Sequence, residues 1–312
     1  MSDPQYAYLR GEFVPLESAT ISIRTHAFLY GTAVFEGIKA YWLPEQGQMG
    51  IFRMAEHYQR LLNSCRILHL RSPLTAEQMG KLTVELLQRN QCRTDTYIRP
   101  IVYKADLRIG PILTSPDTHD DFCLFTLPMG VYLDTEKGLK VGVSPWRRLD
   151  DNAIPARAKV NGAYVNTALA KTDGAACGFD DVIVLTNEGH VAEGSAMNLF
   201  IVRDGQLITS AITDNILEGI TRATVMVLAE QELGLKTVTR PIDRTELYIA
   251  DEAFFVGTAT EVAPITSFDH RPVGSGKVGE ITRQLRTLYS KTVQGLLPQY
   301  ADWITPVPVN FT

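Results

Sequence analysis

Short strand-like segments separated by tight-turn dipeptides fill much of the second half of the chain and limit the folds open to it. Apolar and β-branched residues dominate these segments, which are 139–145, 180–187, 190–194, 198–202 and 206–209. Glu188-Gly189 and Asp204-Gly205 have the composition of hairpin turns. Helical patterns interrupt the strands at about 160–174, 220–233 and 278–294. A barrel-like β unit with helices on its outside is therefore expected here.

The first half mixes helices with strands. Residues 55–68 place apolar side chains three and four positions apart, which predicts a helix. A second helix is expected from Thr75, which can form a capping box with Gln78, to about Gln88. Strands are expected at 51–53, 96–104 and 122–127, and a hairpin at 6–14 that turns at Arg10-Gly11.

The length points to two domains. The chain has 312 residues, beyond the roughly 250–300 residues at which one core stops growing. No repeat and no polar linker interrupts it. The expected fold class is α+β, with a small N-terminal α/β domain at 1–127, a connection at 128–136 and a larger C-terminal domain at 137–312.

Composition excludes several classes of function. Thirty basic and 35 acidic residues give a net charge of −5, which argues against a nucleic-acid or anionic-membrane surface. No apolar run approaches the roughly 18–20 residues that span a bilayer, and the amino terminus lacks the pattern of a secretion signal. The four cysteines form no CxxC pair, so we expect reduced side chains in a cytoplasmic enzyme.

Several common catalytic motifs are missing from the sequence. The six histidines do not fall at metal-ligand spacing and there is no HExxH, so no metal site is expected. GxGxxG and GxSxG are also absent, which argues against a Rossmann cofactor site and an α/β-hydrolase nucleophile. The chemistry must come from residues scattered along the chain.

Lys159 is the first of these residues. Lysine is scarce, with ten residues against twenty arginines, and Lys159 lies among small and apolar neighbours at the expected entry to a helix. A lysine shielded from water has a lowered pKa, and its neutral amine can condense with an aldehyde cofactor. The alternative is a solvated lysine at a helix start.

Two segments have the character of anion sites. Gly219 precedes a helix that opens with Ile220, Thr221 and Arg222, and free N–H groups at such a helix start bind phosphate. Residues 257–260 (GTAT) lie between strands and offer N–H groups and hydroxyls to a phosphate or a carboxylate. Ordinary helix capping and a plain β-turn are the alternatives.

Glu193 is a carboxylate among small residues on an expected strand, where it must be paired or neutral. Facing a pyridinium nitrogen, it would keep that nitrogen protonated; the alternative is a glutamate at a hairpin edge. An amine that condenses with an aldehyde, a partner for a ring nitrogen and two anion sites together match the requirements of pyridoxal 5′-phosphate.

The order and the amino-acid sequences of several segments resemble those of the branched-chain amino acid aminotransferases, which belong to the fold-type IV pyridoxal-phosphate enzymes. The resemblance extends from about residue 6 to residue 292. The segments that carry it are HAFLYGTAVFEGIKAY, EHYQRLLNSCRIL, TYIRPIVY, AKVNGAYVN, AEGSAMNLF, LEGITR and GTATEVAPI. It implies transamination between branched-chain L-amino acids and 2-oxoglutarate.

The resemblance also implies how the cofactor is held. Lys159 matches the lysine that carries the cofactor and moves the proton, Glu193 the partner of the ring nitrogen, and Tyr164 the tyrosine near the ring hydroxyl. Arg60 matches the arginine that binds the phosphate, unless it is only a helix-surface arginine. The residues that would assist Arg60 are Ile220, Thr221 and Thr258.

Substrate residues are implied in the same way. The groups matched to the substrate carboxylate are Tyr97 and the turn at Thr258-Ala259, and those matched to the distal carboxylate of glutamate are Arg99 and Tyr30. The residues matched to the side-chain pocket are Phe35, Met129 and Tyr132. Arg99 in a structural ion pair and the last three in a core are the alternatives. The loop at Leu107–Ile109 matches one that reaches the partner subunit's site, so a homodimer is implied.

Three positions depart from the pattern of the family. Arg108 stands where small residues are usual, Met197 where an acidic residue is common, and Met129 where tryptophan is frequent. Arg108 could bind a carboxylate in place of Arg99 or point outward at the dimer surface. The departures concern the amino acid preference, and they leave the cofactor chemistry as it is.

Other activities of the same fold remain open. They are a D-amino acid or (R)-amine aminotransferase and 4-amino-4-deoxychorismate lyase. A non-catalytic scaffold that keeps the fold is a further alternative, against which Lys159, Glu193 and Arg60 argue because all three are present.

Overall fold

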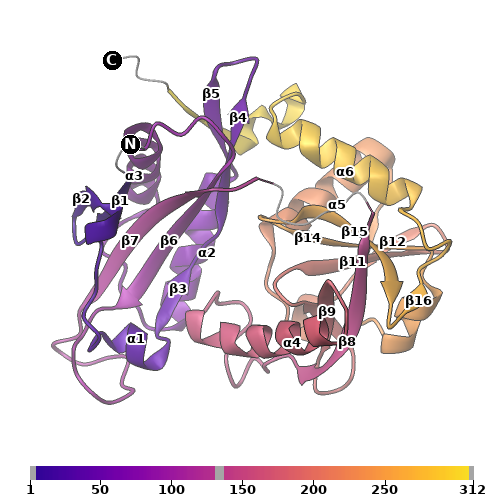
Figure 1. Cartoon of the computed structure of the whole chain (residues 1–312), viewed down its shortest axis with the longest axis horizontal. Helices are drawn as coiled ribbons and strands as arrows, with labels where there is room; N and C mark the ends of the chain where they lie inside the picture. Colours follow the sequence, from indigo (N-terminus) through magenta and orange to yellow (C-terminus); the bar gives the residue numbers. More distant parts are fainter. Residues whose placement is uncertain (1–4, 131–136, 309–312) are drawn as a thin grey trace. The chain divides into compact units, whose positions relative to one another are not determined.

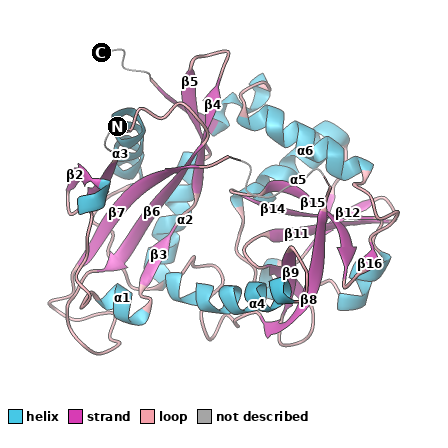
Figure 2. Cartoon of the chain, viewed as in Figure 1, coloured by secondary structure: helices cyan, strands magenta, loops and turns pink. Residues whose placement is uncertain are grey.

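The computed structural model describes residues 5–130 and 137–308. The chain divides into two compact units (Figure 1). The N-terminal unit comprises 1–130, 158–162 and 292–312, and the C-terminal unit comprises 131–157 and 163–291. Each unit combines a β-sheet with helices, so the α+β prediction is confirmed (Figure 2).

An antiparallel sheet forms the centre of the N-terminal unit. Its strands are β1 (Tyr6–Leu9), β2 (Glu12–Pro15), β3 (Ala33–Phe35), β4 (Ile38–Leu43), β5 (Gln48–Phe52), β6 (Thr96–Lys104), β7 (Asp120–Pro128) and β17 (Ile304–Val307). The order is β17-β5-β4-β6-β7-β1-β2, with β3 also paired to β6. β6 pairs with β7 along its whole length, from Thr96 opposite Pro128 to Lys104 opposite Asp120.

Helices of the N-terminal unit pack on this sheet and on each other. They are α1 (His26–Tyr30), α2 (Met54–Ile67) and α3 (Ala76–Arg89), with 3₁₀ turns at Leu16–Ser18 and Pro298–Trp303. Tyr58, Leu61 and Cys65 bury one face of α2, as their spacing predicts. The capping box of Thr75 and Gln78 starts α3 as predicted.

A mixed sheet forms the C-terminal unit. Its strands are β8 (Leu139–Arg147), β9 (Asp181–Leu185), β10 (Val191–Gly194), β11 (Asn198–Arg203), β12 (Gln206–Thr209), β13 (Thr237–Thr239), β14 (Glu252–Gly257), β15 (Glu261–Phe268) and β16 (Arg271–Pro272). The order is β10-β9-β8-β15-β14-β11-β12-β13, with β16 on β15. The Gly194 N–H donates to the Met197 carbonyl over 2.7 Å, so β10 turns directly into β11 and the sheet curves back toward itself.

Helices surround the curved sheet and its apolar core. They are α4 (Tyr164–Ala176), α5 (Ile220–Leu233) and most of α6 (Glu280–Val293), with 3₁₀ turns at Ile212–Asp214 and Arg244–Ile249. Ile183, Leu199 and Phe255 are buried members of this core. This is the barrel-like arrangement with outer helices that the sequence predicts. Within the described residues, no helix combines the length and apolar character that crossing a membrane requires.

Local predictions succeed where the signal is local. Arg10 and Gly11 have φ angles of 53° and 86°, as a primed hairpin turn requires. The sequence does not predict strand β4, because both of its faces are covered and its residues do not alternate. The helix predicted from residue 160 is wrong at its start. Residues 161–163 form a 3₁₀ turn and α4 begins at Tyr164.

The physical reason for the late start of α4 lies in the backbone around Lys159. The Phe35 N–H donates to the Lys159 carbonyl over 3.1 Å, and Val160 forms a bridge with Val34. Lys159 therefore lies beside β3, two residues before the 3₁₀ turn that leads into α4.

Gly174 provides a test of how α4 packs on β9. A Cβ atom there would lie 2.2 Å from Cγ1 of the buried Val182, whose branched side chain has little rotamer freedom. Alanine is the better helix former by roughly 1 kcal/mol, yet we expect Gly174→Ala to lower the free energy of unfolding by about 1–3 kcal/mol. Urea denaturation followed by circular dichroism measures the change. The same substitution should cost little in a Val182→Ala background, and an equal loss in both backgrounds would rule out the clash.

Candidate active site

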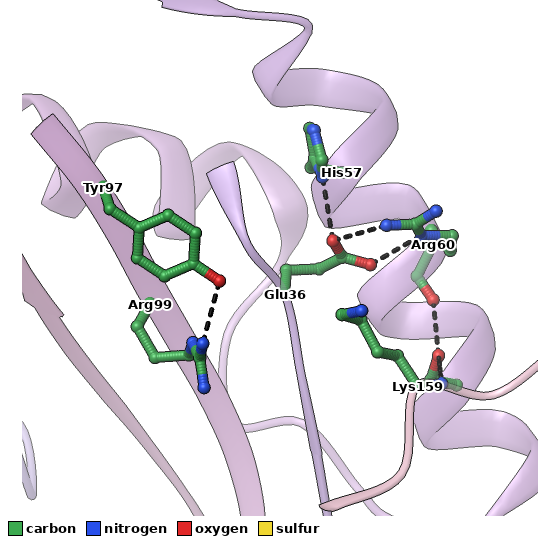
Figure 3. A network of polar contacts seen from close by, with 7 residues as sticks. Glu36, His57, Arg60, Tyr97, Arg99 and Lys159 are labelled. Carbon is green, nitrogen blue, oxygen red and sulfur yellow. Dashed lines mark hydrogen bonds and ion pairs between the residues drawn. The ribbon is translucent and has the colours of Figure 1, made fainter. Parts of the chain in front are cut away.

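A buried carboxylate organises one side of the N-terminal unit. Glu36 follows β3 and is fully buried, and Figure 3 shows His57 and Arg60 of α2 directed toward it. The Arg60 guanidinium donates from Nε to Oε1 over 2.6 Å and from Nη2 to Oε2 over 2.8 Å. Nδ1 of His57 lies 2.8 Å from Oε2. The three-residue spacing of His57 and Arg60 puts both on one face of the helix.

Charge and burial oppose each other in this network. Burial alone would raise the pKa of the Glu36 carboxyl, but the Arg60 charge and the hydrogen bonds from His57 and Arg60 overcome it and hold the pKa far below its usual range. Burial lowers the pKa of His57, against the opposing effect of its hydrogen bond to Glu36. At neutral pH the network is therefore an ion pair with a neutral imidazole attached.

The same helix fixes the backbone of Lys159. The Ser64 hydroxyl donates to the Arg60 carbonyl over 3.0 Å, and the Lys159 N–H donates to the Ser64 oxygen over 3.2 Å (Figure 3). The Lys159 carbonyl accepts from Phe35, so both backbone groups of the lysine are held. Its Nζ lies 4.9 Å from the centre of the Phe35 ring. An amine on a fixed backbone beside an apolar ring suits a reactive lysine.

Arg99 contacts two aromatic rings. The centre of its guanidinium lies 4.4 Å from the Phe35 ring and 5.1 Å from the Tyr97 ring. Nη2 donates to the Tyr97 hydroxyl over 2.8 Å, whereas the buried Nε has no partner among the described residues. A Cβ atom at Gly37 would lie 2.2 Å from the Tyr97 hydroxyl, so only glycine fits there. An unsatisfied buried donor on a cation is suited to an anionic ligand.

The expected substrate loop lies near α1. The Gly110 N–H donates to the Tyr30 hydroxyl over 2.9 Å, and Arg24 donates to the Leu107 carbonyl over 3.1 Å. Leu107 and Ile109 are exposed. Arg108 is half exposed, and its guanidinium contacts Ser115 and lies 3.8 Å from the Asp117 carboxylate.

Met129 and Tyr132, which also have an expected role in the substrate pocket, come after β7 in the sequence. Met129 is half-buried, and its N–H donates to the Asp95 carbonyl over 2.9 Å. Tyr132 lies outside the described residues.

Glu193 is the buried carboxylate of the C-terminal unit. It lies on β10, and Arg148 pairs with its Oε1 over 2.8 Å. Its Oε2 accepts from the Asn198 side chain over 2.9 Å and from the Leu217 N–H over 3.2 Å. The burial that the sequence predicts for Glu193 is thus accompanied by an arginine and two neutral donors. Such pairing offsets the free-energy cost of burying a carboxylate.

The start of α5 lies next to this carboxylate. Asn198 also donates to the Leu217 carbonyl over 3.0 Å, and a Cβ atom at Gly219 would lie 1.9 Å from the Asn198 oxygen. No side chain caps the helix, and its first backbone bond runs from Ala223 to Gly219. The N–H groups of the first turn therefore point beyond the helix, as in phosphate-binding helix starts. Ile220 is half-buried, and Thr221 is buried.

The turn at Thr258-Ala259 joins β14 to β15 in the same unit. β14 pairs with β11 so that Val256 lies opposite Asn198, which brings the turn close to the Glu193 group. Thr260 contacts the Met197 sulfur over 3.0 Å. Tyr164 is half-buried as the first residue of α4. The expected cofactor residues thus fall into two groups, one in each unit.

The sequence reasoning missed the partners of the expected site residues. They are Glu36, His57 and Ser64 in the N-terminal unit and Arg148 and Asn198 in the C-terminal unit. One signal was available: Glu36 is a charged residue directly after an apolar segment, as Glu193 is. Glu36 is fully buried and must therefore be paired.

Known proteins are similar to this chain over nearly its full length. The family model of amino-transferase class IV matches residues 33–268. A probable branched-chain-amino-acid aminotransferase of Aquifex aeolicus is 47% identical over 302 residues, 97% of this chain and 96% of the relative.

Solved structures agree with these relatives. The branched-chain aminotransferase of Thermoproteus uzoniensis with norvaline has a TM-score of 0.93 and 39% identity, over 98% of this chain and 100% of that one. The branched-chain amino acid aminotransferase of Thermobaculum terrenum in its PLP form has a TM-score of 0.93 and 37% identity, over 99% of this chain and 100% of that one.

The lowered pKa of His57 predicts that acid destabilises the protein. The unfolded chain takes up a proton on this side chain near pH 6.5, whereas the folded chain does so only at lower pH, with Glu36, Arg60 and Lys159 as the charged groups around it. Stability is therefore lost as the pH falls below that value, by at most about 1.4 kcal/mol per pH unit. Urea denaturation at pH ~7 and ~5.5 should show a smaller loss for His57→Gln than for the natural protein. Equal losses would exclude His57 as the source.

Proposed function

The chain belongs to the amino-transferase class IV family, and on that basis we propose that it transfers amino groups between branched-chain L-amino acids and 2-oxoglutarate. The observation that carries the proposal is the cluster in which the Lys159 amine and the Arg99 guanidinium both contact the Phe35 ring, 4.9 and 4.4 Å from its centre. An apolar surface and a cation with a buried free donor occur together beside the amine. Such a site can accept an aliphatic side chain and the distal carboxylate of glutamate in turn.

Pyridoxal 5′-phosphate is the proposed cofactor. The uncapped start of α5 and the guanidinium of Arg60 suit its phosphate. The paired carboxylate of Glu193 suits its ring nitrogen. The relative from Thermobaculum terrenum was solved in a PLP form. When bound, the cofactor supplies an aldehyde that condenses with amines and a ring that takes up electrons from the carbon next to them.

Each residue then has a proposed task. Lys159 would hold the cofactor and, once released, remove the proton from the substrate α-carbon and return it to the cofactor carbon. Glu193 would accept a hydrogen bond from the ring N–H, and Tyr164 would contact the ring hydroxyl. The phosphate would be bound by Arg60, Ile220, Thr221 and Thr258.

Substrate groups are assigned from the same reasoning. Arg99 and Tyr30 would meet the distal carboxylate of glutamate, and Tyr97 with the Thr258-Ala259 turn would meet the α-carboxylate. The contact with the Phe35 ring and the hydrogen bond to the Tyr97 hydroxyl restrict the orientation of the Arg99 guanidinium, which favours two-point binding of a carboxylate. The remaining residues proposed to line the site are Phe35, Leu107, Arg108, Ile109, Met129, Tyr132 and Ala259.

The organisation of the enzyme is also proposed. We propose functional domains at 1–127 and 137–312, a homodimer and a cytoplasmic location. The exposed Leu107 and Ile109 support a loop that meets a second subunit. Cys65, Cys92, Cys123 and Cys177 are all free, which accords with a reducing compartment.

Replacing Lys159 tests the proposed chemistry. We expect Lys159→Ala to reduce transamination by at least about 10²–10⁴-fold, because it removes the group that moves the proton. Borohydride reduction followed by peptide mass spectrometry should place the cofactor on Lys159 of the natural protein and nowhere in the variant. Lys140→Ala, at an exposed position, is the control. A label on another lysine, or unchanged turnover, would refute the assignment.

Replacing Arg99 tests the substrate. Arg99→Ala should raise KM for L-glutamate and 2-oxoglutarate by roughly 10–100-fold, since it removes a charged hydrogen bond, and should change KM for L-leucine far less. The exposed Arg93→Ala is the control. Single-turnover reactions with L-leucine, L-valine, D-alanine and (R)-1-phenylethylamine should proceed only with the L-amino acids. Reaction with the D or (R) compounds alone, or pyruvate released without an amino acceptor, would identify one of the alternative activities.

A further inference from the structure

The Glu36–Arg60 pair contains an apparent contradiction. Arg60 is proposed to bind the phosphate of the cofactor, yet a carboxylate lies within hydrogen-bonding distance of its guanidinium at 2.6 and 2.8 Å. A site that needed only positive charge would not place a negative charge there, because the carboxylate weakens the attraction for phosphate. The carboxylate must therefore contribute something other than charge.

Geometry supplies what charge does not. A guanidinium has five N–H groups in a rigid plane. Glu36 takes up Nε and one side of Nη2, so the plane of Arg60 is set and the edge with Nη1 is directed away from the carboxylate. Without such a partner, an arginine side chain has many rotamers and loses entropy when it binds.

The carboxylate is itself held in place. Nδ1 of His57 lies 2.8 Å from Oε2, and the Glu36 N–H donates to the Pro100 carbonyl over 3.0 Å. Glu36 and His57 are buried, with 0% and 2% of their surfaces exposed. Glu36, in the segment after β3, and His57 and Arg60 of α2 thus fix one another (Figure 3).

We propose that Glu36, oriented by His57, is a positioning residue that fixes the Arg60 guanidinium for the phosphate of the cofactor. The inference rests on the proposed function, because it takes the phosphate role of Arg60 as given. Its chemical content is specific: Glu36 should affect ligands that carry the phosphate, and not the rest of the cofactor.

Paired ligands separate this role from a general effect on folding. Binding of pyridoxal 5′-phosphate and of pyridoxal, which lacks the phosphate, is measured by absorbance titration of the cofactor-free protein. In Glu36→Gln an amide replaces one acceptor by a donor and breaks the two-point contact. We expect affinity for pyridoxal 5′-phosphate to fall at least tenfold and affinity for pyridoxal to change less than about threefold, since one charged hydrogen bond corresponds to roughly tenfold or more in affinity.

Glu36→Asp separates position from charge. It keeps the charge but shortens the side chain by one carbon–carbon bond, about 1.5 Å, so the carboxylate no longer reaches both nitrogens. The proposal predicts a selective loss for this variant too. If the Glu36→Asp variant binds pyridoxal 5′-phosphate with unchanged affinity and the Glu36→Gln variant binds it more tightly, Glu36 only neutralises charge. The proposal is then wrong. Equal losses for both ligands would show a merely structural role and would also overturn it.

Two further variants, Arg60→Ala and the control Glu56→Gln, complete the binding experiment. In an Arg60→Ala background, Glu36→Gln should have no further selective effect, because the group through which it acts is gone. Glu56→Gln removes another carboxylate of α2 that receives a 2.8 Å hydrogen bond from an arginine, Arg53, and it should leave both affinities unchanged. If Arg60→Ala itself causes no selective loss, the proposed phosphate role fails. If Arg60→Ala does and the Glu36 variants do not, the positioning role alone fails.

Discussion

The cluster around Lys159 in the N-terminal unit depends on one buried ion pair. Removing a carboxylate from water is costly unless charged and neutral donors replace the solvent. Glu36 meets this condition with two nitrogens of Arg60 and one of His57. Removal of either partner would leave an unpaired buried charge, so each side chain stabilises the other in this position. The site gains a guanidinium with a defined plane in return for a reduced net charge.

One helix also positions the backbone of Lys159. His57, Arg60 and Ser64 succeed one another on a single face of α2, at spacings of three and four residues. The first two bind Glu36, and Ser64 links the Arg60 carbonyl to the Lys159 N–H. The position of the guanidinium and the position of the lysine backbone are therefore set by the same element. A shift of α2 would move both together.

The amino-acid sequence predicts the parts of this arrangement that depend on near neighbours. The capping box at Thr75, the hairpin turn at Arg10 and the long strand from Thr96 each depend on residues within a few positions. The sequence does not predict that the backbone of Lys159 pairs with Phe35, more than a hundred residues earlier. The sequence does not reveal the roles of Arg148 and Glu36 for the same reason, since each meets its partner only after the chain has folded.

The two units solve the same electrostatic problem in opposite senses. Glu36 with Arg60 and Glu193 with Arg148 are both buried pairs, with the arginine 12% and 13% exposed and the glutamate 0% and 5%. In the first pair the arginine is the proposed ligand-binding group and the carboxylate supports it; in the second the carboxylate binds and the arginine supports. In each pair the supporting member lies outside the segment that contains the binding member, 24 residues from Arg60 in the first pair and 45 from Glu193 in the second. When a motif identifies only the residue that binds the ligand, a search for a buried side chain of opposite charge beside it would identify the supporting residue.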